Sequence, residues 1–485
     1  MSGSVVWFRR DLRLDDNPAL LAAVQRGGPV VCLFVWAPEE EGDWAPGAAS
    51  RWWLHQSLLR LDESLRRLGA SLTLRRGPTI ETIQEILKTT DCDAVFWNRV
   101  YEPETMQRDS LIKRLLRENG VHAESFKGSL LVEPWEVLTG QSRPYQVFTP
   151  FWKACAAHLP PEPPKPVPTT LLPPNPRPHS LDLADFGLEP TIDWAGGLRA
   201  AWNPGEDGAT AALNAFLAEG LPEYAEFRNR PDVRGTSRLS PHLHFGEISI
   251  RRVWHAVNGH SPGRDSKSPN RKDKQDENVR VFCSELGWRE FAHHLLYHFP
   301  HTPDTPLRQE FLRFSWQPSR ERLRAWQRGR TGYPIVDAGM RELWHTGWMH
   351  NRVRMIVASF LVKHLLIPWN EGARWFWDTL VDADLPNNTL GWQWTAGCGA
   401  DAAPYFRVFN PILQGKKFDP EGVYVRRWIP ELRRVPTSYI HCPWEMPAEA
   451  LAQAGVTLGD HYPLPIVEHG EARAQALKAW EAIRE

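Results

Sequence analysis

One stretch of predicted helix carries three side chains that could bind a ligand. In "SELGWREF", Glu285, Trp288 and Arg289 are spaced i, i+3 and i+4, so a carboxylate, an indole and a guanidinium share one helix face. The carboxylate can hydrogen-bond a ligand edge, the indole can stack on a flat ring, and the guanidinium can bind an anion. A surface ion pair or a satisfied core polar group is the simpler explanation of such a face on its own.

A second stretch repeats this geometry. In "MHNRVRM", Asn351, Arg354 and Met355 have the same i, i+3 and i+4 spacing. Two helix faces that each mix large apolar groups with hydrogen-bonding groups are typical of the walls of a cavity that binds a flat aromatic ligand.

A cluster of hydroxyl groups lies where a helix is predicted to begin. In "YAEFRNRPDVRGTSRLSPHLHFGEIS", Thr236, Ser237 and Ser240 precede or start a helical pattern. We expect Ser240 as the N-cap and Pro241 at the first helical position, where free backbone donors favour an anion such as a pyrophosphate. An ordinary helix start is the alternative.

The elements that position these residues change in kind along the chain. Up to about residue 130, β-branched runs at 4–8, 29–36, 71–76, 93–98 and 122–128 alternate with helical patterns at 17–27, 51–69, 79–90 and 105–120. This alternation predicts an α/β domain with a mainly parallel sheet, like a Rossmann domain. The domain lacks the glycine patterns GxGxxG and GxxxxGK[ST] that cradle phosphates, so we expect a nucleotide cofactor elsewhere.

A proline-rich connector separates this domain from a helical one. Residues 159–178, "LPPEPPKPVPTTLLPPNPRP", can form neither a helix nor an interior strand. Helical patterns follow at 208–221, 277–299, 319–329, 333–347 and 349–366, which predicts an all-α second domain. We expect domains at 1–135 and 201–485 joined by a connector at 136–200. The polar residues 259–278 read as a surface loop, either a solvated insertion or a DNA contact.

The composition limits the class of protein. The net charge is −1, so nucleic-acid binding would need a local basic patch. The six cysteines form no CxxC pair, which argues against a zinc site and a secreted disulfide framework, and no metal site is expected. Without a signal peptide or an apolar run long enough for a bilayer, we expect a soluble cytoplasmic protein, and we expect a monomer.

Seven motifs together give the chain a family resemblance. These are "FRRDLRLDDNPAL", "APEEEG", "RGTSRLSPHLHFGEIS", "ELGWREF", "GYPIVDAGMREL", "GWMHNRVRMIVASFLVKHLL" and "DADLPNNTLGWQWTAGCGADAAPYFRVFNP". The chain resembles the photolyase/cryptochrome family over nearly its whole length, and is most similar to class III cyclobutane pyrimidine dimer photolyases. The resemblance implies an N-terminal antenna domain and a C-terminal helical domain that binds FAD. It also implies light-driven repair, in which excited reduced FAD donates an electron to a dimer flipped out of DNA.

The resemblance assigns roles to residues around the flavin. It pairs Asp382 with Arg354 beneath the flavin ring, and places Asn388 at flavin N5. Trp316, Trp369 and Trp392 match the electron-transfer relay of the family, for which core packing is the alternative. The implied FAD contacts are Tyr224, Thr236, Ser237, Arg238, Leu239, Ser240, Arg289, Asn351, Arg354, Asp382, Ala383, Asp384 and Asn388.

The resemblance also implies how damaged DNA is bound. Trp288 would stack on the dimer, Glu285, also implied in catalysis, would hydrogen-bond its base edges, and Trp394 would close the cavity. Asn351 and Met355 would complete the dimer contacts. The implied contacts to backbone phosphates are Arg352, Arg228 and Arg407.

Individual positions favour one branch of the family. Plant cryptochromes carry Asp where this chain has Asn388 and lack the indole of Trp288, whereas (6-4) photolyases have a second histidine at Asn351. We therefore expect a cyclobutane pyrimidine dimer photolyase, with a blue-light photoreceptor and, after it, a (6-4) enzyme as alternatives. The implied antenna is 5,10-methenyltetrahydrofolate, although the class I folate-contacting pair appears here as Glu104 and Thr105.

Overall fold

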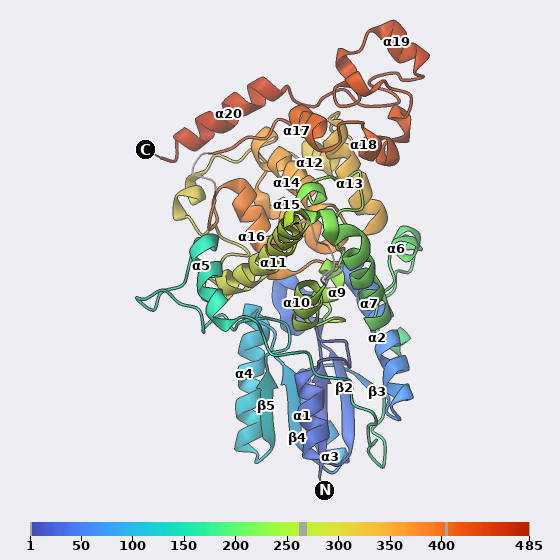
Figure 1. The fold of residues 1–485 in the computed structure, drawn as a ribbon, viewed down its shortest axis with the longest axis vertical. Coiled ribbons are helices and arrows are strands. Elements are labelled where there is room, and N and C mark those ends of the chain that lie inside the picture. Colours follow the sequence, from blue (N-terminus) through green and yellow to red (C-terminus); the bar gives the residue numbers. More distant parts are fainter. Residues whose placement is uncertain (1, 261–268, 403–405, 485) are drawn as a thin grey trace. The chain divides into compact units, whose positions relative to one another are not determined.

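The computed structural model (Figure 1) describes residues 2–260, 269–402 and 406–484. The chain forms two compact units. Unit 1 comprises residues 1–218, 237–300 and 381–385, and unit 2 comprises residues 219–236, 301–380 and 386–485. These units differ from the domains expected at 1–135 and 201–485, and that division stays a prediction.

Unit 1 contains a five-stranded parallel sheet in the order β3-β2-β1-β4-β5. All residues of β1 and β2 are buried, as expected for runs of Val, Phe and Trp in a sheet that is covered on both faces. The strands are β1 (Gly3–Phe8), β2 (Val30–Trp36), β3 (Leu72–Arg76), β4 (Cys92–Asn98) and β5 (His122–Phe126). The predicted parallel α/β sheet is confirmed.

Helices pack on both faces of this sheet (Figure 1). On one face, Trp7, Leu33 and Val95 of the strands pack against Ile83 of α3 (Thr79–Thr89) and Ile112 of α4 (Pro103–Glu118). Side chains alternate along a strand, so neighbouring strand residues face the other side, where α1 (Pro18–Arg26) lies against β1, β4 and β5. Helix α2 (Ala48–Arg67) packs against β3.

The carboxyl ends of β1 and β4 are occupied by ion pairs. Arg10 binds both Glu41, at 2.9 Å, and Glu102. The guanidiniums of Arg9 and Arg108 lie 4.3 and 5.0 Å from the ring centre of Trp7. Dinucleotide-binding sheets hold phosphates at the carboxyl ends of their strands, and in this sheet Arg9, Arg10 and Glu102 lie at that edge.

The rest of unit 1 is mainly helical. Among its described residues, 159–180 lie in neither a helix nor a strand, as the proline content predicts. Its further helices are α5 (Phe148–Cys155), α6 (Gly196–Ala201), α7 (Glu206–Ala215), α9 (Ser240–His244), α10 (Ile250–Gly259) and α11 (Pro269–His298). The surface loop predicted at 259–278 is therefore wrong from Pro269 onward, because that lysine- and glutamate-containing sequence favours extension of α11. Residues 261–268 lie outside the described residues.

Unit 2 is built from helices around buried polar anchors. The carboxylate of Asp337 accepts hydrogen bonds from Thr331 N at 2.7 Å, Gly332 N at 3.0 Å and the Tyr462 hydroxyl at 2.7 Å. The helices are α8 (Tyr224–Phe227), α12 (Arg320–Gln327), α13 (Pro334–Thr346), α14 (Asn351–Ser359), α15 (Trp369–Thr379), α16 (Leu385–Ala396), α17 (Pro411–Phe418), α18 (Val423–Trp428), α19 (Ala448–Gln453) and α20 (His469–Glu481). The predicted all-α second part is confirmed.

Short 3₁₀ and π segments connect these helices. The π segments are η4 (Phe216–Gly220) and η7 (Phe360–His364). The 3₁₀ segments are η1 (Pro38–Trp44), η2 (Ala156–His158), η3 (Leu183–Phe186), η5 (Leu221–Glu223), η6 (Gln309–Arg313), η8 (Pro430–Leu432), η9 (Thr437–Tyr439) and η10 (Pro443–Glu445). In the part of the chain that the structure describes, no helix has the length and apolar character that crossing a membrane requires.

Candidate functional site

The middle of α11 is fixed to a neighbouring loop of unit 1. Arg289 Nη1 donates to the carbonyl of Ser129 at 2.7 Å. Glu290 Oε2 accepts from the backbone N–H groups of Leu131 at 2.8 Å and Val132 at 3.0 Å. Burial raises the pKa of Glu290 to about 7, although Arg289 and the two backbone donors oppose the rise. Hydrogen bonds therefore hold the backbone at this point of α11 in one position.

The Trp288 indole on α11 stacks on another aromatic ring. Its ring centre lies 3.9 Å from that of Phe148, with 10° between the planes. Trp152 runs nearly parallel to Phe148, at 6.4 Å and 12°. Trp288 remains half-buried, and Glu285 lies one turn before it on the same helix. The helix face predicted from the sequence is therefore present, whereas the contribution of α5 was not predicted.

Two aspartates of unit 1 lie just before α16. Asp382 and Asp384 are buried, as is Ala383 between them. Asp384 Oδ2 lies 3.4 Å from His244 Nδ1 and 4.0 Å from His293 Nε2. Burial alone would raise the pKa of Asp384, but His293, the hydrogen bond from His244 and nearby Arg289 hold it well below its usual range. Asp384 is thus a buried anion among hydrogen-bond donors.

The hydroxyl-rich segment at 236–240 differs from the expected helix cap. Helix α9 begins at Ser240, its N-cap is Leu239, and no side chain makes a capping hydrogen bond, so the predicted N-cap at Ser240 is wrong by one residue. Ser237 Oγ instead accepts from Leu239 N at 3.4 Å, which stabilises the turn before the helix. Since α9 has only five residues, its dipole contributes little to anion binding, and Thr236, Ser237 and Arg238 supply the side-chain donors of this segment.

Arg238 has an unusual backbone conformation. Its φ is 53°, in the left-handed region that bulky residues rarely adopt, and its guanidinium lies 4.2 Å from the ring centre of Trp202. Such conformations cost about 1–3 kcal/mol and cluster at ligand-binding sites.

A buried network that the sequence analysis missed supports this segment. Glu247 accepts hydrogen bonds from Trp53 Nε1 at 2.9 Å and from the Ser57 hydroxyl, and it also bonds His242 Nδ1 in α9. The network ties α9 to α2. "HLHFGE" after the serine cluster was the available signal, but its partner lies about 190 residues earlier.

In unit 2, α14 carries the second predicted face. His350 caps the helix, since its Nδ1 accepts from Arg352 N at 3.1 Å. Arg354 Nε donates to the carbonyl of Met349 at 2.8 Å, which fixes its guanidinium close to the helix start. Asn351 is exposed and Met355 is half-buried.

Arg352 has partners that the sequence analysis did not identify. Its Nη2 and Nε donate to Asn229 Oδ1 at 2.7 and 3.2 Å, and its guanidinium lies 4.6 Å from the ring centre of Phe418. These contacts restrict the guanidinium to one orientation before any ligand binds. Arg228, beside Asn229 in sequence, lies 5.8 Å from the ring centre of Tyr224.

Asn388 is oriented by the neighbouring helix. Its Nδ2 donates to the carbonyl of Ala373 in α15 at 3.1 Å. This bond fixes the amide plane and leaves Oδ1 as its acceptor. Farther along the chain, Trp394 is half-buried, and Arg407 is exposed while its carbonyl accepts from Lys363 Nζ at 2.6 Å.

The three relay candidates have separate environments. Trp392 is buried against Phe376, with ring centres 5.0 Å apart. Trp369 is buried at the start of α15, and Trp316 is half-buried 4.4 Å from Phe314. Among the described residues, no ring contact joins two of the three tryptophans, so the relay stays a prediction. In the same ranges, no group of three or more His, Cys, Asp or Glu side chains could hold a metal ion.

Comparison with known families and proteins accounts for both parts of the chain. Residues 4–169 match the DNA photolyase family, and residues 282–482 match the FAD binding domain of DNA photolyase. The chain is 48% identical to a deoxyribodipyrimidine photo-lyase of Agrobacterium fabrum over 99% of its own length and 98% of that protein. It is 44% identical to cryptochrome-1 of Arabidopsis thaliana over 98% of its own length and 70% of that protein.

Comparison with a solved structure supports the same family as these sequence relatives. The chain matches the crystal structure of a bacterial class III photolyase from Agrobacterium tumefaciens with a TM-score of 0.94 and 48% identity, over 100% of this chain and 98% of that one. The similarity thus covers the sheet, the helices and every residue singled out above, and the chain belongs to the DNA photolyase family, which it shares with the cryptochromes.

Proposed function

We propose that this protein is a class III photolyase that splits cyclobutane pyrimidine dimers in DNA under blue light. The observation that carries the proposal is the half-buried Trp288 indole beside Glu285 on the fixed part of α11. An indole there can stack on an unstacked pyrimidine, and a carboxylate one turn away can bind its edge. The full-length similarity to a deoxyribodipyrimidine photo-lyase supports it.

The residues present fit FAD as the cofactor. Thr236, Ser237 and Arg238 supply hydroxyl and guanidinium donors suited to a pyrophosphate, and the left-handed Arg238 is typical of a ligand-binding segment. With them we propose Tyr224, Leu239, Ser240, Arg289 and Asn351 as FAD contacts.

A second group of residues suits the flavin ring. Asp382, Ala383 and Asp384 are buried, and Arg354 is held by the Met349 carbonyl. A fixed guanidinium lowers the free energy of a reduced, anionic ring relative to its protonated form. We propose that Asn388, whose amide is oriented by Ala373, accepts a hydrogen bond from flavin N5 without adding charge.

The chemistry needs little from the protein beyond positioning. When bound, reduced FAD excited by blue light supplies the electron that opens the cyclobutane ring. The chain's own part is to stack the lesion on Trp288, to bind its base edges through Glu285 and Asn351, and to pack Met355 and Trp394 against it. Arg352, Arg228 and Arg407 would bind backbone phosphates.

Further roles rest on the family resemblance. We propose Trp392, Trp369 and Trp316 as the route by which an external reductant recharges the flavin. The proposed antenna is 5,10-methenyltetrahydrofolate in the domain of residues 1–135, before the connector 136–200 and the catalytic domain 201–485. The protein would act as a monomer in the cytoplasm. A near-ultraviolet folate band in the spectrum of the purified protein tests the antenna.

A blue-light photoreceptor is the second candidate. The 44% identity to cryptochrome-1 of Arabidopsis thaliana favours it. Asn388 and Trp288 favour repair, because an oriented amide can face flavin N5 without adding charge and a half-buried indole can stack on a pyrimidine.

The deciding experiment is light-dependent repair. Protein with chemically reduced FAD is mixed with an oligonucleotide that contains one thymine dimer, and the restored thymines are counted after blue light and in the dark. We expect repair in light only, and Asn388→Asp should weaken it, because a carboxylate beside N5 can supply a proton and, if ionised, repels reduced flavin. A protein with full FAD occupancy that repairs nothing under light contradicts the proposal and leaves the photoreceptor.

A further inference from the structure

We propose that Phe148 is a positioning residue for lesion recognition, because it covers one face of Trp288 and leaves the opposite face as the platform for a pyrimidine. The inference rests on the proposed function. It adds a residue of α5, which the sequence pattern on α11 does not include.

The stack of Phe148 on Trp288 is close and nearly parallel. A centre-to-centre distance of 3.9 Å with 10° between the planes leaves no room for a base between the two rings. Since the covered face cannot accept a ligand, the half-buried indole can stack a base on its other face only. Trp288 is therefore a one-sided platform and not one half of a clamp with Phe148.

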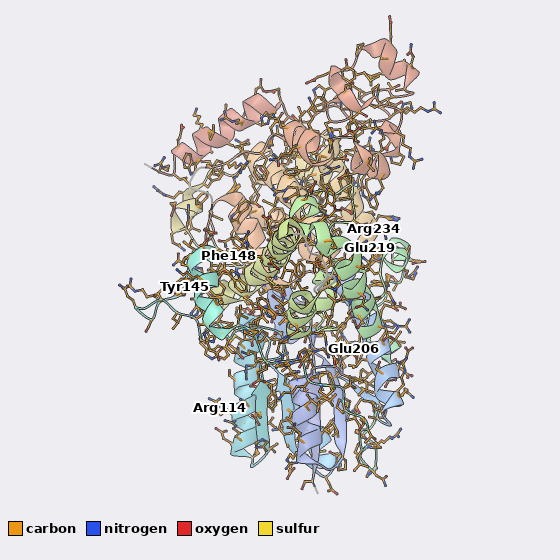
Figure 2. The ribbon with its side chains drawn as sticks, viewed as in Figure 1. Arg114, Tyr145, Phe148, Glu206, Glu219 and Arg234 are labelled. Carbon is orange, nitrogen blue, oxygen red and sulfur yellow. The ribbon has the colours of Figure 1, made fainter. Side chains whose placement is uncertain are left out.

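Phe148 is itself buried and packed against three other rings. It is 8% exposed, and it is the first residue of α5 (labelled in Figure 2). Phe291 packs edge-on against both Phe148, at 6.0 Å, and Trp288, at 5.9 Å. Trp152 continues the parallel arrangement on α5. Phe148 and Phe291 thus set the plane of the indole, and Trp152 packs behind Phe148.

A glycine permits this approach of α5 to α11. A Cβ built on Gly287 would lie 2.6 Å from the Trp152 ring, closer than real carbon contacts. Gly287 directly precedes Trp288, and Arg289, which directly follows, is bonded to the Ser129 carbonyl. The backbone on both sides of Trp288 is therefore constrained, so the platform is formed before DNA arrives, and binding loses less side-chain freedom.

The test removes the stack without removing the apolar side chain. Phe148→Leu keeps an apolar side chain at this position but has no ring, and Phe148→Tyr keeps the ring. Phe151→Leu is the matched control, because Phe151 lies on the same helix and packs on Phe291 and His294. For each variant with full FAD occupancy, affinities for a thymine-dimer oligonucleotide and its undamaged counterpart are titrated at one salt concentration.

We expect Phe148→Leu to weaken dimer binding about three- to tenfold, the usual contribution of an aromatic pair, with undamaged DNA unaffected. Phe148→Tyr should restore binding, and Phe151→Leu should match the wild type. Equal dimer affinity in Phe148→Leu and wild type, or an equal loss in Phe151→Leu, overturns the inference. If Phe148→Leu does not fold, Phe148→Met replaces it with the same expectation.

Failure of this inference is distinguishable from failure of the proposed function. A wild type that binds dimer and undamaged DNA equally contradicts the function. A wild type that discriminates, together with Phe148 variants that discriminate as well, contradicts only the role of Phe148.

Discussion

Helix α11 in unit 1 and helix α14 in unit 2 hold their proposed DNA-contacting side chains in different ways. Trp288 on α11 is oriented by an aromatic stack on Phe148. Arg352 on α14 is oriented by two hydrogen bonds to Asn229 and by the Phe418 ring. Rings fix the indole, and a mainly polar contact fixes the cation.

The difference matches two kinds of recognition. An indole platform distinguishes an unstacked pyrimidine from a stacked one, because its contact area depends on the base being out of the duplex. A guanidinium attracts any phosphate and carries no information on damage. We therefore infer that Trp288 on α11 provides selectivity for the lesion and that Arg352 on α14 provides general affinity for DNA.

The largest expected effect concerns the anchor of α11, Glu290. Its folded-state pKa of about 7 lies above its ordinary value of 4.5, so the folded protein binds more protons than the unfolded chain between these pH values. The free energy of unfolding should then fall as pH rises from 4.5 to 7, by up to about 3 kcal/mol. Glu290→Gln cannot titrate, but keeps an oxygen for both backbone donors, so the part of this fall that Glu290 contributes should disappear, while Glu206 and Asp419, whose pKa values are also raised, keep theirs.

Urea unfolding of the FAD-loaded protein across this pH range measures the effect. Glu136→Gln is the matched control, because Glu136 is exposed close to the same loop, and its pH profile should follow the wild type. An unchanged pH dependence in Glu290→Gln would show that the anchor is already ionised in the folded protein.

A smaller effect is expected on α14. Arg352→Gln should weaken the binding of dimer-containing and undamaged DNA equally, by about tenfold, because one charged contact to a phosphate is lost. The slope of log K against log salt should become shallower by about 0.9. Titration at four salt concentrations measures both values, with Arg473→Gln, an exposed arginine on α20, as the control. A loss confined to damaged DNA would assign Arg352 to the lesion instead.

The sequence predicted most of the fold because its elements are local. The Val- and Phe-rich strands, the amphipathic helices of unit 1 and the proline-rich connector each carry their own pattern. Residues 269–278 were the exception, since polar helix formers without an apolar face resemble a loop. The prediction of Ser240 as the N-cap was wrong for a related reason. The turn before α9 is stabilised by Ser237 and not by a capping side chain.

For the candidate site, the sequence predicted which side chains could contact FAD or DNA. It did not predict which residues fix the orientation of those side chains. The holding residues are distant in the chain: Asn229 precedes Arg352 by 123 residues, and Ser57 precedes Glu247 by 190. Periodicity carries no information on such pairs. Phe148 was missed for the same reason, since its ring in "VFTPFW" gives no sign of its partner.

The ratio of affinities for dimer-containing and undamaged DNA tests the central claim most directly. It should be measured side by side for wild type, Trp288→Ala and Arg352→Gln, each with full FAD occupancy and at one salt concentration. We expect Trp288→Ala to lower this ratio because one base–aromatic stack is lost, which corresponds to a loss of about 1 to 3 kcal/mol in the binding free energy of dimer-containing DNA alone. Arg352→Gln should leave the ratio unchanged. A ratio that is unchanged in Trp288→Ala, or that falls equally in both variants, would contradict the separation of lesion recognition by Trp288 from general DNA binding by Arg352.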